Sequence, residues 1–121
     1  MEMKVQKDSN DVFLLEISGP LDLLSSNQLK EQFIKLIESK IEYLIIDLIG
    51  VSNINSPGIG ALIYISSTLR KLKCPLIIVA PEGPVLSVLE LTRLKNYFTV
   101  VPTVEAAMSL TACARKIKGR R

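Results

Sequence analysis

The sequence predicts an α/β fold in which helices pack mainly on one face of a four- to five-stranded mixed sheet. Two short apolar runs, at residues 44–48 and 75–79, have the length and composition of strands buried on both faces of a sheet. They alternate with longer segments in which apolar residues recur at helical spacing, which is typical of parallel strands joined by right-handed crossovers. Two more strands are expected ahead of these runs, so the predicted sheet is mixed.

The length of 121 residues predicts one domain, 1–121, with a core over about 3–112 and a basic C-terminal segment at 115–121. Apolar residues make up 48% of the chain, yet no apolar run approaches the roughly 20 residues that span a bilayer. The first eight residues are polar and charged, unlike a signal peptide. We therefore expect a cytoplasmic protein without membrane insertion.

The composition excludes several classes of function. The chain has no histidine, which rules out catalytic triads that use histidine and metal sites built on it. Cys74 and Cys113 are far apart and have no metal or redox spacing, so we expect both to be small buried residues. A net charge of +3 with 5% aromatic residues predicts no direct nucleic-acid binding. We expect no metal, no cofactor and no enzymatic turnover.

The chain begins with a predicted β-hairpin. Residues 3–7 alternate apolar and charged side chains, as an edge strand does, and the turn-forming residues 8–11 follow. Residues 12–17 form the second predicted strand, which we expect Gly19 and Pro20 to end.

The first helix is predicted to begin near Ser25, because Gln28 three residues later completes a capping box. It is expected to run to about residue 39. Its predicted buried positions are Leu29, Phe33, Leu36 and Ile37.

The strand at 44–48 is predicted to lead, through a turn at 49–55, into a helix at 57–73. Pro57 suits the first helical position, where its missing N–H has no partner in any case. Ser56 before it is then the predicted N-cap, and a phosphate there would meet the positive end of the helix dipole. Most serines in such a sequence only cap a helix, so the residues alone leave both roles open.

The rest of the chain continues the alternation. After the strand at 75–79, Pro84 is placed to start a third helix, and residues 97–101 form a fifth strand. Thr103 is the predicted N-cap of the last helix. The basic segment 115–121 suits the negative end of that helix and is expected to be solvated.

The segment around Ser56 resembles the motif of the STAS family, the anti-sigma factor antagonists of bacteria. In that family a buried strand leads to an Asp-Ser-Ser-Gly or Asp-Ser-Ala-Gly turn, and here the matching residues are Asn55, Ser56, Pro57 and Gly58. The GPLD sequence at 19–22 also resembles the family's Gly-x-Leu/Ile-Asp turn. The resemblance covers about residues 5–108.

The resemblance implies an antagonist that binds an anti-sigma factor serine kinase. The kinase would phosphorylate Ser56, and a cognate phosphatase would reverse the modification. Asn55 replaces the family's aspartate, which either eases the added phosphate or removes a contact with the kinase; the sequence leaves the direction open. The implied partner-binding residues are Asp22, Asn55, Ser56, Pro57, Gly58, Ile59 and Gly60.

Two other functions remain open at this point. A STAS-like accessory subunit of an ABC-type lipid transporter would dock on an ATPase without needing phosphorylation. A small nucleotide-binding or catalytic domain is disfavoured, because residues 58–60 lack the full GxGxxG and the Walker lysine. Asp22 and Asp47 are isolated carboxylates, and Asp47 and Ser52 are expected to be structural.

Overall fold

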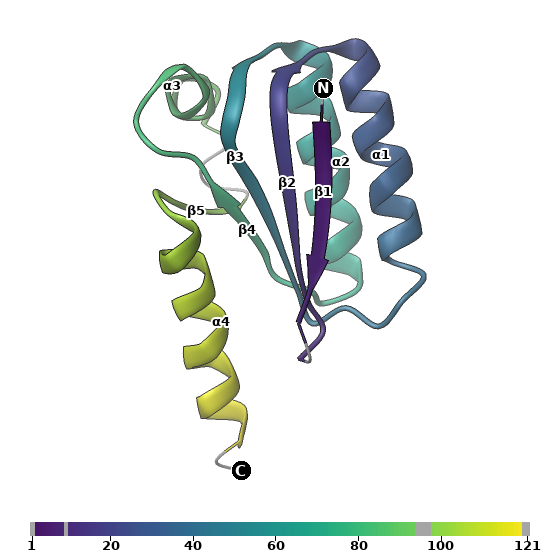
Figure 1. The fold of residues 1–121 in the computed structure, drawn as a ribbon, viewed down its shortest axis with the longest axis vertical. Helices are drawn as coiled ribbons and strands as arrows, with labels where there is room; N and C mark the ends of the chain where they lie inside the picture. The colour runs from purple at the N-terminus through teal and green to yellow at the C-terminus, as the bar shows by residue number, and fades with distance from the viewer. Residues whose placement is uncertain (1, 9, 94–97, 120–121) are drawn as a thin grey trace.

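A single five-stranded sheet organises the protein (Figure 1). The computed structural model describes residues 2–8, 10–93 and 98–119, with side chains described as far as residue 112. The strands lie in the order β1-β2-β3-β4-β5, with β1 antiparallel to β2 and the other neighbours parallel, which confirms the mixed sheet. The strands are β1 (Glu2–Lys7), β2 (Val12–Leu21), β3 (Tyr43–Ile54), β4 (Leu76–Val79) and β5 (Thr99–Val101), and the helices are α1 (Leu23–Leu36), α2 (Ser56–Lys71), α3 (Pro84–Leu91) and α4 (Val104–Gly119).

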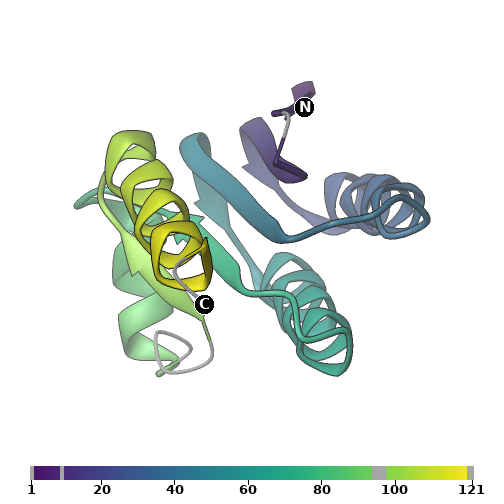
Figure 2. The same ribbon diagram turned by 90° about the horizontal axis from the view of Figure 1, so that it is seen from below.

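Helices cover the two faces of the sheet unequally, as predicted. Side chains of α1, α2 and α3 share the larger apolar core with one face, whereas α4 packs on the other (Figure 2). On the α4 side a smaller cluster is formed by Val12, Tyr43, Ile45, Ile77, Val79 and Ala107. Among the described residues, no helix is long and apolar enough to cross a membrane.

Strands β2 and β3 are both longer than predicted. The expected turn at 49–55 is wrong, since β3 continues to Ile54, and Gly19 and Pro20 do not end β2, which continues to Leu21. The ladder pairs Leu21 with Ile54 through register shifts between Glu16 and Ser18 and between Gly19 and Leu21. Such irregularities accommodate a proline without an N–H and a glycine at positive φ, and they break the two-residue period that marks a strand in sequence.

Several helix boundaries also differ from prediction. The first two helices end at Leu36 and Lys71, before the predicted ends. The start of α3 at Pro84 is confirmed, and the N–H of Ala106 donates to Oγ1 of Thr103 at 3.0 Å, which confirms the predicted cap of α4.

Two predictions fall partly outside the described residues. Cys74 is buried as expected, whereas the side chain of Cys113 is not among those described. Of the basic segment, residues 115–119 belong to helix α4, and residues 120–121 lie outside the described part of the chain.

Candidate functional site

Two helix N-termini lie side by side at one edge of the sheet. Because β2 and β3 are parallel, both end at the same edge, uppermost in Figure 1, and the paired residues Leu21 and Ile54 are the last of each strand. Asp22 and Asn55 follow directly as the N-caps of α1 and α2, and the N–H of Asn55 donates to the carbonyl of Leu21 at 3.4 Å. Two segments far apart in sequence thus bring the predicted site residues together at what we call the switch edge, formed by Asp22 and residues 55–60.

Asp22 closes a capping box at the start of α1. Its Oδ1 accepts the N–H of Ser25 at 3.1 Å, and the N–H of Asp22 donates to Oγ of Ser25 at 2.8 Å. The backbone N–H of Ser25 above all, and the Ser25 hydroxyl, which donates to the same Oδ1 at 3.0 Å, hold the pKa of Asp22 below its ordinary value of 3.8. The predicted N-cap at Ser25 is therefore wrong. Asp22 is the N-cap, and Ser25 at the third helical position exchanges hydrogen bonds with it. The preference of aspartate for N-caps was the signal in the sequence.

Ser56 occupies the first position of α2 rather than its N-cap, which corrects the second predicted cap. Asn55 is the N-cap, in an extended conformation with φ of −118°, but within the described chain its side chain makes no capping hydrogen bond. Pro57 is tolerated one position later than predicted, because N–H groups throughout the first turn lack intrahelical acceptors. The N–H groups of Ser56 and Gly58 therefore lack an intrahelical acceptor at the start of the helix. Both Ser56 and Asn55 are exposed.

Gly58 presses the first turn of α2 against the end of β2. A Cβ at this position would lie 2.7 Å from the carbonyl oxygen of Leu21 and 2.8 Å from Cγ1 of Ile54, so only glycine fits. Gly60 faces open space, with nothing within 4 Å of a Cβ built there. Of the predicted partner-binding residues, Gly58 is buried, Asp22, Pro57 and Ile59 are half-buried, and Asn55, Ser56 and Gly60 are exposed.

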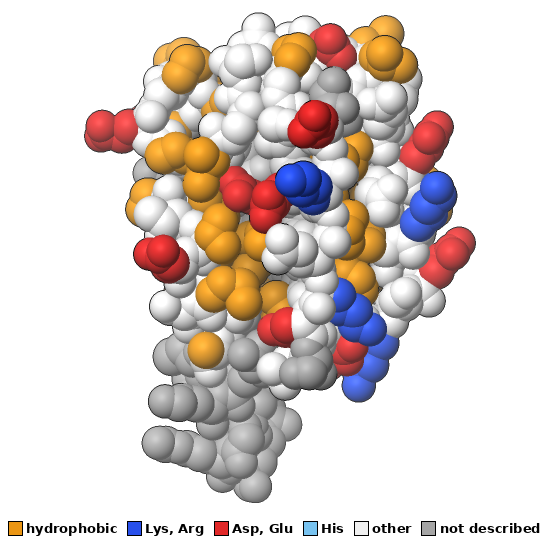
Figure 3. All heavy atoms as spheres, in the orientation of Figure 1, with side chains coloured by type: hydrophobic (Ala, Val, Ile, Leu, Met, Phe, Trp, Pro, Cys, Tyr) orange, Lys and Arg blue, Asp and Glu red, His pale blue; other side chains and the backbone are white. Residues whose placement is uncertain are grey.

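Two exposed leucines extend the switch edge, and sequence reasoning did not single them out. Leu23 is 64% exposed and Leu24 is 69% exposed in the first turn of α1. Figure 3 shows hydrophobic side chains at this upper right corner of the molecule. Beside them lies a shallow hollow of about 130 Å³ lined by Pro20, Asp22, Leu24, Ser25 and Gln28. The signal was the apolar pair directly after Asp22, which the predicted start of α1 placed outside the helix.

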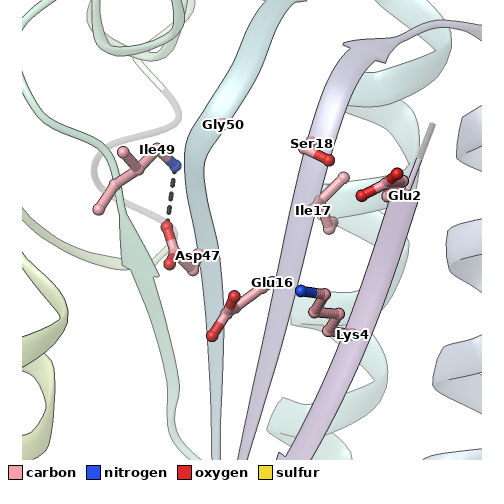
Figure 4. Close-up of a pocket in the computed structure, with 8 residues that line it drawn as sticks. All are labelled: Glu2, Lys4, Glu16, Ile17, Ser18, Asp47, Ile49 and Gly50. Atoms are coloured by element: carbon pink, nitrogen blue, oxygen red, sulfur yellow. Dashed lines mark hydrogen bonds between the residues drawn. The ribbon is translucent and has the colours of Figure 1, made fainter.

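Asp47 and Ser52 lie away from this edge, both within β3. Oδ1 of Asp47 accepts the N–H of Ile49 at 2.9 Å, and Asp47 lines a hollow of about 340 Å³ on the face of the sheet opposite α1 and α2 (Figure 4). The structure does not bring Asp22 and Asp47 together as an acid and base pair. Among the described residues, no three or more His, Cys, Asp or Glu side chains are grouped so that they could hold a metal ion.

Residues 3–107 match the family model described as STAS domain. The chain belongs to the STAS domain family. Its fold is similar to that of an anti-sigma factor antagonist from Mycobacterium paratuberculosis, with a TM-score of 0.81 and 24% identity over 90% of this chain and 92% of that one. It is also similar to the Bacillus cell fate determinant SpoIIAA in its phosphorylated form, with a TM-score of 0.72 and 15% identity over 91% of this chain and 99% of that one. At these identities the two structures establish likeness of fold alone.

A curated relative of another kind matches part of the STAS domain. In an alignment of 95 residues that covers 69% of this chain, the sequence is 30% identical to Sulfate transporter 3.1 of Arabidopsis thaliana. The match covers 14% of that transporter's length.

Proposed function

We propose that this STAS domain is an anti-sigma factor antagonist that binds an anti-sigma factor serine kinase through the switch edge. The observation that carries the proposal is the exposed hydroxyl of Ser56, in the first turn of a helix, beside a second helix N-terminus. Family membership and the fold shared with anti-sigma factor antagonists support it. The interaction takes place in the cytoplasm and involves no nucleic acid.

Phosphorylation of Ser56 is the proposed switch. The hydroxyl oxygen attacks the γ-phosphate of ATP held by the kinase, its proton passes to a base of the kinase, and ADP leaves. The chain supplies the acceptor and no catalytic group. A cognate phosphatase removes the phosphate by hydrolysis and restores the binding form.

The position of Ser56 explains how a phosphate changes binding while the fold persists. A phosphate carries a charge of about −1.5 to −2, and the dipole of α2 and its free N–H groups stabilise that charge in the isolated domain. Asn55, where the family motif has an aspartate, adds no negative charge beside it. In a docked complex the same phosphate is buried without a counter-charge, which costs several kcal/mol.

The test is to incubate the purified chain with an anti-sigma factor kinase of the same organism and ATP. Mass spectrometry should find one phosphate, on Ser56. Ser56→Asp should weaken binding of the kinase with little change in melting temperature, and Ser56→Ala should bind without being phosphorylated. Ser67→Asp, an exposed serine later in α2, is the matched control and should leave binding unchanged. Phosphate on another residue, or none, would contradict the proposal.

The 30% identity to Sulfate transporter 3.1 favours a second candidate, a STAS domain that docks on a transporter protein. The accessory subunit of an ABC-type lipid transporter is the form of this function that the motif also suggests. Capture of the tagged chain from its native source separates the two candidates, because the first predicts a serine kinase and the second a transporter ATPase.

A further inference from the structure

Helix α4 covers only part of its face of the sheet. It packs against β3, β4 and β5. Near the start of β2, Val12 and Leu14 also pack with Ala107 and Met108 of this helix. In the described part of the chain no helix ribbon lies over β1 or the rest of β2 on this side, as Figures 1 and 2 show. We call the surface of β1, β2 and the adjoining side of β3 the uncovered face.

The uncovered face changes from apolar to acidic along the direction of β2. Near the start of β2, the half-buried Leu14, the buried Val12 and Met108 of α4 line a hollow of about 110 Å³, with Gln6, Lys7 and Asp8 around it. Further along, Glu16 and Asp47 line the hollow of about 340 Å³. Figure 3 shows the acidic side chains at the centre of this face.

The acidic hollow holds an excess of negative charge. Its lining includes the three carboxylates of Glu2, Glu16 and Asp47 and the single ammonium group of Lys4 (Figure 4). Glu16 and Asp47 are direct neighbours in the β2–β3 ladder, where like charges destabilise a sheet. A cationic group placed over this pair would relieve the repulsion.

Helix α4 runs past the sheet at the opposite end from the switch edge (Figure 1). Of the side chains of α4 as far as residue 112, those of Ala107 and Thr111 are buried, and the helix continues to Gly119. Eight further residues add about 12 Å of helix. Their sequence is small and apolar at residues 113–114 and then basic, with Arg115, Lys116 and Lys118. This end points away from the acidic hollow of its own chain, so it reaches such a hollow only on another molecule.

We propose that two copies of the chain associate, with the C-terminal half of each α4 lying on the uncovered face of the other copy. A two-fold axis normal to the sheet sets the two α4 helices antiparallel. The C-terminal half of each helix then contacts the uncovered face of the other copy in the same way. The order of polarity along the sequence then matches, because residues 113–114 come level with the apolar hollow and the basic residues that follow come level with Glu16 and Asp47. The lengths also match, since Tyr43 to Asp47 spans about 13 Å of strand and the helix beyond Thr111 about 12 Å.

Sedimentation velocity on the full chain tests this from micromolar to millimolar concentration. We expect a monomer–dimer equilibrium that is clear at about 0.1 M salt and weaker at about 1 M, where the Debye length falls from about 10 to about 3 Å. A chain that stays monomeric throughout overturns the proposal and leaves the face to a cationic segment of another protein.

A charge exchange identifies the contact. Asp47→Lys and Lys116→Glu should each weaken the dimer by about tenfold or more, and the two together should recover most of the loss. Glu31→Lys, the same change of charge on the exposed side of α1, is the control and should have no effect. Circular dichroism melting verifies folding, and if Asp47→Lys does not fold, Glu16→Gln should show a smaller loss in the same direction. A dimer indifferent to these changes, or a double variant no better than the single ones, overturns the proposal.

Discussion

At the scale of single residues, Gly58 determines how closely α2 approaches β2, and its replacement has a predictable cost. In Gly58→Ala the new Cβ would lie 2.7 Å from the carbonyl oxygen of Leu21, which is backbone and cannot rotate away. We expect a loss of about 1–3 kcal/mol in the free energy of unfolding, as for other overpacked sites. Urea unfolding followed by circular dichroism measures it.

Gly60→Ala is the matched control in the same helical turn. Nothing lies within 4 Å of its added Cβ, so only the helix propensity changes. We expect stabilisation by about 0.5–1 kcal/mol. Equal effects of the two substitutions would show that close packing at Gly58 does not constrain the switch edge.

Cys74 is expected to react slowly with thiol reagents. Burial, assisted by the negative charge of Glu42, raises the pKa of its thiol to about 11. At pH 8 about one thiol in a thousand is then ionised, and the thiolate is the reactive form. In a Cys113→Ser background, the rate of modification should be low at pH 8, should increase toward pH 11, and should rise sharply when the protein is unfolded. Fast modification of the folded protein at pH 8 would contradict this.

At the scale of elements, the two helices that start at the switch edge are capped differently. The N-terminus of α1 is closed by the capping box of Asp22 and Ser25, whereas the side chain of Asn55 leaves the first turn of α2 unsatisfied. The first helix therefore holds a fixed shape beside the second, whose free donors are available to a phosphate on Ser56.

This asymmetry predicts different outcomes for two alanine substitutions. Asp22→Ala should lower the melting temperature at pH 7, and Asn55→Ala should leave it nearly unchanged, because only the first removes a capping bond. Since the pKa of Asp22 is lowered in the folded state, its contribution is fully present above pH 3.8 and is lost as the pH falls through the folded pKa. Thermal melts between pH 7 and pH 2 should show the wild type and Asp22→Ala converging in acid. A constant difference would exclude the carboxylate as its source.

The sequence predicted the elements whose periodicity is regular and failed where the sheet is irregular. The apolar run at 44–48 is the buried middle of β3, but Val51 and Ile54, the next buried residues, are three apart and interrupt the two-residue period. Register shifts in the β2–β3 ladder produce that spacing, and they depend on the partner strand, which local sequence does not contain. The same holds for the candidate site. Ser56 is predicted from its local motif, whereas Leu23 and Leu24 come to lie beside it through the pairing of Leu21 with Ile54.

At the scale of the whole molecule, the sheet separates two surfaces. The switch edge lies at the carboxyl ends of the parallel strands, and the basic end of α4 lies beyond their amino ends (Figure 1). Asp47 precedes the end of β3 by seven residues, so about 23 Å of strand separates it from the start of α2. At such a distance the effects of substitutions at two sites are usually additive.

The two proposed interactions should therefore respond independently to substitution. Ser56→Asp should weaken binding of the kinase and leave the dissociation constant of the dimer within about twofold, because at physiological salt a charge about 23 Å away is screened over a Debye length of about 8 Å. Asp47→Lys should do the reverse. Titration of each variant with the kinase, alongside sedimentation of each variant alone, measures both constants. If Ser56→Asp also dissociates the dimer, the two surfaces are coupled, and the β2–β3 ladder between them would have to transmit the change across its two register shifts.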